Sequence, residues 1–487
     1  MPAHMLFNSI NYFLFLFAVF ILNYIIPNRF RWMLILVASV FFYMIAGAAT
    51  IIVPIVIILC TFIFGILIER TSNARRKKTY FLSGLFINLG LLIFFKYINF
   101  FIATAFDGFN FINHLVRDEQ TVKHSSIILQ LVVPLGISYI TFQAIGYLIE
   151  INRGNQNSEK NLGFFATYLL FFPKLISGPI ERAHNFLPQL RQKHVFNYEQ
   201  VVEGLNRILW GLFLKLVVAN RLALYTDAVF NNSDKHSGIT LLMASVFFTV
   251  QLFADFAGYT DIAIGSAQIL GYRLMENFNS PFIAKSVTEF WRRWHISLTT
   301  WVNEYIYNPI VIKWRNWNKW GVVFAAIVTF LILGFWHGAN WTFIIFGFLQ
   351  GIALTLEFLS RKLRKRIRSK IPSWLNSVLG ISFTFGYFCF STIFFKANTA
   401  TDAFSIVGKI FTFSGPLYFE GPSILIYSFF GIFFLAIAGL IREFYPERIS
   451  FFNNKHWIVR ILSYDLLIII ILLLGVFDGG QFIYFQF

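Results

Sequence analysis

Charged residues are scarce in this chain of 487 residues: Asp, Glu, Lys and Arg make up 13% of it, whereas hydrophobic residues make up 57%. Soluble globular domains carry about 25% charged residues, so this composition excludes a soluble protein or a separate soluble domain. We expect an all-α polytopic membrane protein with about 11 transmembrane helices, at about 20 residues per span. Residues 1–26 are expected to form the first span rather than a cleaved signal peptide, because no basic region precedes their apolar run.

Cysteine is also scarce. The two cysteines, Cys60 and Cys389, both lie in apolar runs. A free thiol in such surroundings behaves as a small hydrophobe, so we predict neither a disulfide framework nor a metal site. Internal repeats of fixed period and low-complexity linkers are absent as well, which argues against a transporter built from inverted repeats.

The positive charge of the chain, formally +17, lies between apolar runs. Loops rich in Lys and Arg face the cytoplasm, so we place the basic loops at residues 70–78 and 361–370 inside. The loop around Arg442, Arg448 and Lys455 is also placed inside, and both chain ends then lie outside. The pattern therefore predicts a multi-pass topology, with the lipid bilayer as partner and no nucleic acid.

Helix-breaking residues interrupt the apolar runs in the middle of the chain, for example at residues 134–139 and 172–179. Irregular backbone at membrane depth is tolerated only where it is buried in protein or lines a water-filled cavity. We therefore expect a catalytic core at residues 134–360, with broken, re-entrant and interfacial helices around a central funnel or tunnel. Residues 1–133 and 361–487 would add flanking spans to this single membrane domain.

His337 is the most informative residue of the chain. It lies in the motif FWHGANW, within residues 321–356, a stretch without Asp, Glu, Lys or Arg. Ionisable groups at membrane depth are rare and tend to mark ion paths, proton relays or reaction sites. The alternative is a histidine that is hydrogen-bonded between packed helices. We predict the catalytic role, because a second histidine occupies an equally unusual setting.

This second histidine is His295, in the motif FWRRWHISL. If residues 288–305 form one helix, its apolar stripe contains Trp291, Trp294, Leu298, Trp301 and Tyr305. The neighbouring face would contain His295, Arg292, Thr299 and Asn303. This pattern is typical of an amphipathic helix at a membrane interface. Interfacial anchoring explains the tryptophans but not the histidine.

Four further charged residues lie in or near apolar runs. Asp255 and Asp261 are predicted to support the site: each could orient a histidine, pair with a buried cation or cap a broken helix. Lys174 and Lys215 are expected to extend their ammonium groups to an interface. None of the four is predicted to be catalytic.

Together these segments resemble the membrane-bound O-acyltransferase (MBOAT) family, and within it the membrane subunits of bacterial alginate O-acetyltransferases. The resembling segments agree in order and spacing along nearly the whole chain: residues 134–143, 171–180, 255–265, 276–282, 291–301, 335–338 and 482–487. One departure is Lys396, where relatives usually have arginine.

The resemblance implies that His337 is the family's essential histidine and that His295 is its second active-site position. It also implies acetyl-CoA as a cytoplasmic acyl-donor substrate, with no bound cofactor. A periplasmic partner resembling serine hydrolases would complete the transfer to an exported polysaccharide. Relatives that transfer D-alanine to teichoic acids typically have asparagine in place of Arg292, so the arginine favours acetyl transfer.

The chemistry of these residues fits acyl transfer from a thioester to a hydroxyl. An alcohol is a weak nucleophile and needs a base, and a neutral histidine in apolar surroundings can accept its proton. His295 would orient the donor, polarise its carbonyl or pass protons. Asn340 or Trp336 is predicted to donate a hydrogen bond to the developing oxyanion.

Four basic residues near these motifs are predicted to attract the phosphates of coenzyme A: Arg292, Arg293, Lys313 and Arg315. Interfacial anchors would have the same pattern. Two other functions compete with acetyl transfer. A D-alanyl transferase would need a carrier protein at the cytoplasmic face, and a transporter would use the histidines as a proton relay. Consumption of a thioester distinguishes an acyltransferase from a transporter.

Overall fold

The computed structural model describes residues 7–117, 129–412, 414–419, 421–444, 456–478 and 482–483, and all regular elements among them are helices. Ten helical segments in this part of the chain are long and apolar enough to cross a membrane. Two shorter apolar segments, Ile10–Ile25 and Leu162–Lys174, accompany them. The prediction of an all-α polytopic membrane protein is confirmed.

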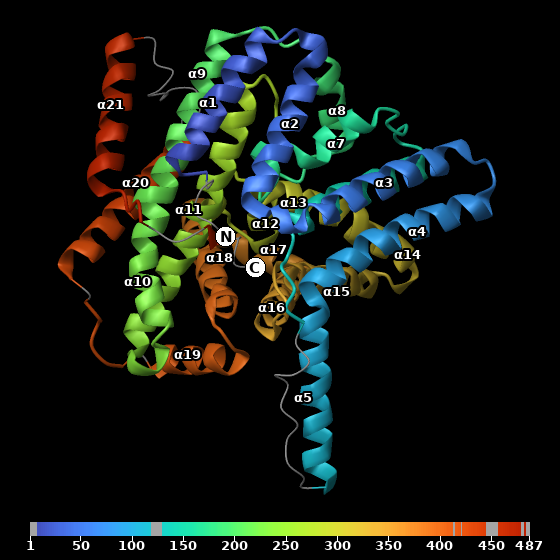
Figure 1. The fold of residues 1–487 in the computed structure, drawn as a ribbon. Coiled ribbons are helices and arrows are strands. Elements are labelled where there is room, and N and C mark those ends of the chain that lie inside the picture. Colours follow the sequence, from blue (N-terminus) through green and yellow to red (C-terminus); the bar gives the residue numbers. More distant parts are fainter. Residues whose placement is uncertain are drawn as a thin grey trace. The chain divides into compact units, whose positions relative to one another are not determined.

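The chain divides into two compact units, Met1–Val195 and Phe196–Phe487. This boundary falls inside the expected core at residues 134–360, and the division into three parts stays a prediction. The first unit contains α1 (Ile10–Ile25), α2 (Asn28–Gly47), α3 (Ile52–Arg70), α4 (Ala74–Leu92), α5 (Ile98–Arg117), α6 (Ile137–Arg153), α7 (Leu162–Leu170) and α8 (Ala183–Arg191). In this unit α3 and α4 lie side by side (Figure 1). Both also pack against α6.

Both breaks expected in the first unit are present. Residues 171–182 lack α-helix and are buried, as irregular backbone at membrane depth requires. The turn before α6 contains Gly136 at φ 65°, where a Cβ atom would collide with the carbonyl oxygen of Leu175. Only glycine fits this left-handed position without strain.

Lys174 lies inside this break and does not reach an interface. Its side chain is fully buried, its ammonium donates to Oε1 of Gln143, and the Tyr168 ring lies 4.5 Å from it. The expectation of an interfacial lysine is therefore wrong, because a side-chain amide and an aromatic face satisfy the charge inside the unit.

The second unit is built around α11 (Gly238–Ile269), which packs against α9, α10, α18 and α19. The other long helices of the unit are α9 (Tyr198–Leu212), α10 (Asn220–Phe230), α15 (Lys319–His337), α16 (Trp341–Leu359), α18 (Ser373–Lys396), α19 (Ala400–Thr412), α20 (Pro422–Phe444) and α21 (Trp457–Leu474). Residues 213–219 form a π-helical segment that joins α9 to α10. Shorter helices are α12 (Val287–Arg293), α13 (Ile296–Val302), α14 (Asn308–Lys313) and α17 (Arg361–Arg368).

The hairpin of α15 and α16 positions His337 at its turn. The two helices approach closely at Gly334 and Gly347, where a Cβ atom would collide with the carbonyl oxygens of Phe343 and Phe330, respectively. Small residues allow such contact between membrane helices. Asn340 begins α16 as its N-cap, since its Oδ1 accepts a hydrogen bond from the backbone N–H of Thr342 at 3.1 Å.

Candidate active site

The segment predicted as one helix over residues 288–305 is broken at His295, so that prediction is wrong. Helix α12 ends at Arg293, α13 begins at Ile296, and His295 has φ 45° and ψ 53°, in the left-handed region. A residue with a Cβ atom rarely adopts this conformation, which costs on the order of 1–3 kcal/mol and persists only where its surroundings impose it. The break takes the His295 ring off the helix face predicted for it.

Asn277 holds this turn in place. Its backbone oxygen accepts a hydrogen bond from the N–H of Ile296 at 2.9 Å, and its Oδ1 accepts one from the N–H of Ser297 at 3.2 Å. These two donors belong to the first turn of α13, where intrahelical acceptors are missing. Asn277 belongs to residues 276–282, one of the segments that resemble the family, but the sequence alone predicted no role for it.

The structure brings both histidines close to one indole ring, that of Trp336. The Trp336 ring centroid lies 6.2 Å from that of His295 and 5.0 Å from that of His337. Phe256 packs edge-on against His295 at 4.6 Å, and Phe395 against His337 at 5.2 Å. Both histidines are buried, with exposed fractions of 0% for His295 and 5% for His337. Side chains from α11, α15, α18 and the His295 turn therefore form one aromatic-walled site.

Burial, with a smaller contribution from nearby His337, lowers the pKa of His295 well below its ordinary value of 6.5. Desolvation penalises the charged imidazolium and leaves the neutral ring. A neutral imidazole has one nitrogen that can accept a proton. At neutral pH the His295 ring is therefore neutral, with one nitrogen that carries no proton.

Asn340 already makes two hydrogen bonds in its capping position. Besides accepting from Thr342, it donates through Nδ2 to the backbone oxygen of Asn398 at 3.0 Å. Trp336, by contrast, has its ring close to both histidines. The geometry therefore places the Trp336 indole nearer to the reacting groups, and the oxyanion role of Asn340 stays a prediction.

Asp255 pairs with a buried cation, one of the three roles considered for it. Its Oδ1 lies 2.6 Å from Nζ of Lys215, and its Oδ2 accepts a hydrogen bond from the backbone N–H of Ile483 at 2.6 Å. The Lys215 ammonium also lies 4.2 Å from the Phe482 ring centroid. Lys215 is buried, so the expectation that it reaches an interface is wrong. The pair fixes residues 482–483 against α11, next to Phe256 and the site.

Asp261 likewise pairs with a cation, here Arg207 of α9. Nε of Arg207 donates to Asp261 at 2.8 Å, and Nη1 donates to Glu276 at 2.6 Å. Asp261 and Glu276 therefore hold one guanidinium between α9, α11 and the segment that leads to Asn277. Within the described residues, no hydrogen bond links either aspartate to a histidine.

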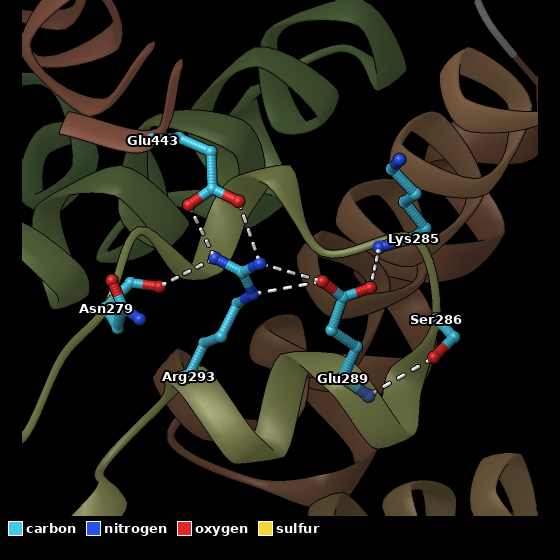
Figure 2. A network of polar contacts seen from close by, with 6 residues as sticks. All are labelled: Asn279, Lys285, Ser286, Glu289, Arg293 and Glu443. Carbon is cyan, nitrogen blue, oxygen red and sulfur yellow. Dashed lines mark hydrogen bonds and ion pairs between the residues drawn. The ribbon is translucent and has the colours of Figure 1, made fainter. Parts of the chain in front are cut away.

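The predicted coenzyme A residues differ in their surroundings. Arg293 is held between Glu289 and Glu443, with N–O distances of 2.9 Å to each, and it also donates to the backbone oxygen of Asn279 (Figure 2). Arg293 joins α12 to the end of α20. The phosphates of coenzyme A would have to displace two carboxylates in order to bind it. Arg292, Lys313 and Arg315 are exposed, and no hydrogen bond or ion pair within the described residues links them to the histidines. Phosphate binding by these four residues stays a prediction.

Comparison with known proteins places this site in a family. Residues 158–397 match the sequence model of the membrane-bound O-acyltransferase family. The chain is 36% identical to the probable alginate O-acetylase AlgI of Azotobacter vinelandii, over 72% of this chain and 68% of that protein. The chain belongs to the MBOAT family. The resemblance drawn from its motifs is confirmed, and the protein is an acyltransferase.

Other relatives of this MBOAT protein carry names that refer to different polymers. It is 32% identical to the peptidoglycan O-acetyltransferase of Helicobacter pylori, over 77% of this chain and 72% of that protein. It is 30% identical to the teichoic acid D-alanyltransferase of Bacillus subtilis, over 54% of this chain and 69% of that protein. The matched family region contains both His295 and His337. Within the described part of the chain, no three His, Cys, Asp or Glu side chains gather as a metal site would require.

Proposed function

We propose that this MBOAT protein is an O-acetyltransferase subunit of the bacterial inner membrane. It takes acetyl from cytoplasmic acetyl-CoA and makes it available outside for O-acetylation of an exported polysaccharide. The observation that carries the proposal is the pair of buried histidines that both lie close to the Trp336 ring. The acetyl preference is supported by the names of the more similar relatives. The family resemblance implies that Arg292 favours acetyl transfer as well.

In this proposal His337 is the general base. It accepts the proton of an acceptor hydroxyl while the hydroxyl oxygen attacks the carbonyl carbon of the acetyl thioester. The new C–O bond forms, the C–S bond breaks, and the departing thiolate takes the proton from His337. The base is neutral again at the end of the cycle, so no other reactant is consumed.

His295 and Trp336 assist this step. The neutral His295 ring, fixed by the Asn277 turn, orients the donor or relays the proton. The Trp336 indole N–H donates to the oxygen of the tetrahedral intermediate, where negative charge develops. The apolar rings around the site exclude water, which would otherwise hydrolyse the thioester.

The proposed topology places the donor side at the basic loops. Helix α17, Arg361–Arg368, is basic at every position except Leu363 and Ile367, and it would lie in the cytoplasm together with residues 70–78. Both chain ends would then lie outside. The loop around Arg442 was also placed inside, but its residues Arg448 and Lys455 lie outside the described residues. A periplasmic partner with a serine-hydrolase-like site would complete the transfer to the polysaccharide.

The proposal is tested in inverted membrane vesicles that receive radiolabelled acetyl-CoA. With the wild-type protein and its partner, we expect label to reach an acceptor in the lumen. His337→Ala should lower this transfer about a hundredfold to ten-thousandfold, the usual contribution of a general base. The matched control is His184→Ala, which removes an exposed histidine of α8. Transfer that is equal in wild type and His337→Ala would contradict the catalytic assignment.

A second arm distinguishes the donors and the competing functions. Vesicles receive either acetyl-CoA or a carrier protein loaded with D-alanine. Turnover of the loaded carrier alone would replace acetyl transfer with D-alanyl transfer. If neither thioester is consumed while a polymer still crosses the membrane, the protein would be a transporter.

A further inference from the structure

A large cavity lies within the second unit, and neither His295 nor His337 is among its lining residues. Its volume is about 1170 Å³, and its lining comes from α9, α11, α18, α20, α21, the π-helical segment and residues 276–283. Pockets for drug-sized ligands usually hold about 300–1,000 Å³, so this cavity suits a larger occupant. Every long helix around it is a candidate membrane span. The cavity is therefore enclosed by helices that are expected to cross the membrane.

The lining changes in character along the length of these helices. Charged side chains gather near one end of the helices: Glu203, Arg207, Asp261, Glu276 and Arg442. Farther along the same helices the walls are apolar, with residues such as Phe213, Val250, Phe434 and Ile470. This order, charged and then apolar, matches the order of headgroup and acyl chains in a phospholipid.

Two buried polar atoms lie where these parts meet. Thr260 and Asn277 both line the cavity, next in sequence to Asp261 and Glu276, and their exposed fractions are 2% and 0%. Oγ1 of Thr260 and Nδ2 of Asn277 have no hydrogen-bond partner among the described residues. Buried donors are normally satisfied, so the two atoms indicate an acceptor that belongs to a ligand. The ester carbonyls of a diacyl phospholipid occupy this level, between headgroup and chains.

The charges at the polar end select the headgroup. Three carboxylates face two guanidiniums there, and Arg207 is already held by Asp261 and Glu276. The surplus negative charge disfavours an anionic lipid. A headgroup with an ammonium for the carboxylates and a phosphate for Arg442 is complementary. A primary ammonium can also donate hydrogen bonds to Glu203, which a choline headgroup cannot.

We propose that this cavity is a binding site for an ethanolamine phospholipid. The acyl chains occupy the apolar part, the ester carbonyls accept from Thr260 and Asn277, and Arg442 binds the phosphate. The same Asn277 amide accepts the hydrogen bond from Ser297 beside His295. A lipid bound to Nδ2 of Asn277 therefore braces the turn that carries His295 from the opposite side.

The test measures bound lipid, so its outcome does not depend on the acetyl donor. The full chain is purified in detergent and equilibrated with an equimolar mixture of phosphatidylethanolamine, phosphatidylcholine and phosphatidylglycerol with identical acyl chains. Retained lipid is counted by native mass spectrometry. We expect one phosphatidylethanolamine per chain, retained several-fold more than either competitor. Equal retention of all three lipids, or preference for phosphatidylglycerol, would overturn the proposal without any variant.

Variants assign the effect to the cavity. Thr260→Val and Arg442→Gln should each lower retention of phosphatidylethanolamine several-fold, and Glu203→Gln should remove the preference over phosphatidylcholine. The control Arg460→Gln changes an exposed arginine of α21 that does not line the cavity. Variants are compared only where gel filtration shows a folded protein. Wild-type retention in folded Thr260→Val and Arg442→Gln would exclude this cavity as the site.

Discussion

Removing one partner of the Lys215–Asp255 pair is expected to destabilise the protein far more than removing both. Each side chain is only 3% exposed, so Asp255→Ala leaves an ammonium buried without its counter-charge, 2.6 Å from where the carboxylate was. The change also removes the acceptor of the Ile483 N–H. Breaking a buried pair in this way typically costs about 3–5 kcal/mol, because the remaining charge stays desolvated.

The double variant Asp255→Ala with Lys215→Met removes both charges and keeps an apolar chain in the place of the lysine. Replacing a buried pair by apolar residues is often close to neutral, so we expect the double variant to recover most of the loss. The double variant should still be less stable than the wild type by about 1–3 kcal/mol, because the N–H of Ile483 has lost its acceptor. The double variant would then lose much less stability than the sum of the losses in the two single variants.

The assay is a double-mutant cycle on the free energy of unfolding, measured by denaturant titration in detergent for the wild type, both single variants and the double variant. Limited proteolysis of the C-terminal segment is measured in parallel, because the pair fixes residues 482–483. If Asp255→Ala costs less than about 1 kcal/mol, or if the two single losses add, the pair is not buried as described. Unchanged proteolysis in Asp255→Ala would refute its role in holding the segment.

Three further predictions concern the histidine site and its surroundings. His295→Gly should be more stable than His295→Ala in thermal unfolding, because glycine adopts φ 45° without strain. Both variants should lose acyl transfer in the vesicle assay. The pKa of His295 is lowered on folding, so the unfolded chain binds more protons below its ordinary pKa of 6.5. Stability should therefore fall as the pH drops below that value, by at most about 1.4 kcal/mol per pH unit, and His295→Gln should flatten this slope. Arg293→Gln should cost about 1 kcal/mol or less, because its carboxylate partners Glu289 and Glu443 are partly exposed and screened by solvent; a larger loss would show that the network is more important than its exposure indicates.

Much of the architecture follows from composition and local pattern alone. Low charge and long apolar runs predicted an all-helical membrane protein, and the structure confirms it because each span satisfies its backbone hydrogen bonds internally. The same rule predicted the breaks near residues 134–139 and 172–179. The exceptional setting of His337, in a stretch without other charges, pointed to the site before any geometry was known.

Local pattern could not predict where the chain brings distant residues together. A helical period over residues 288–305 was a reasonable reading of the tryptophans, but contacts with Asn277 impose a left-handed His295 and end the helix there. Lys174 and Lys215 likewise carry no signal of their buried partners.

The sequence by itself therefore determined the class of the protein, its broken middle region and its two histidines. The tertiary structure decided which groups these histidines meet, and which charges neutralise each other. The physical reason is the range of the interactions. Burial of apolar residues and helical hydrogen bonds act within one segment, whereas Arg293 and Glu443 form an ion pair across 150 positions of sequence. Such pairs exist only after the helices have packed.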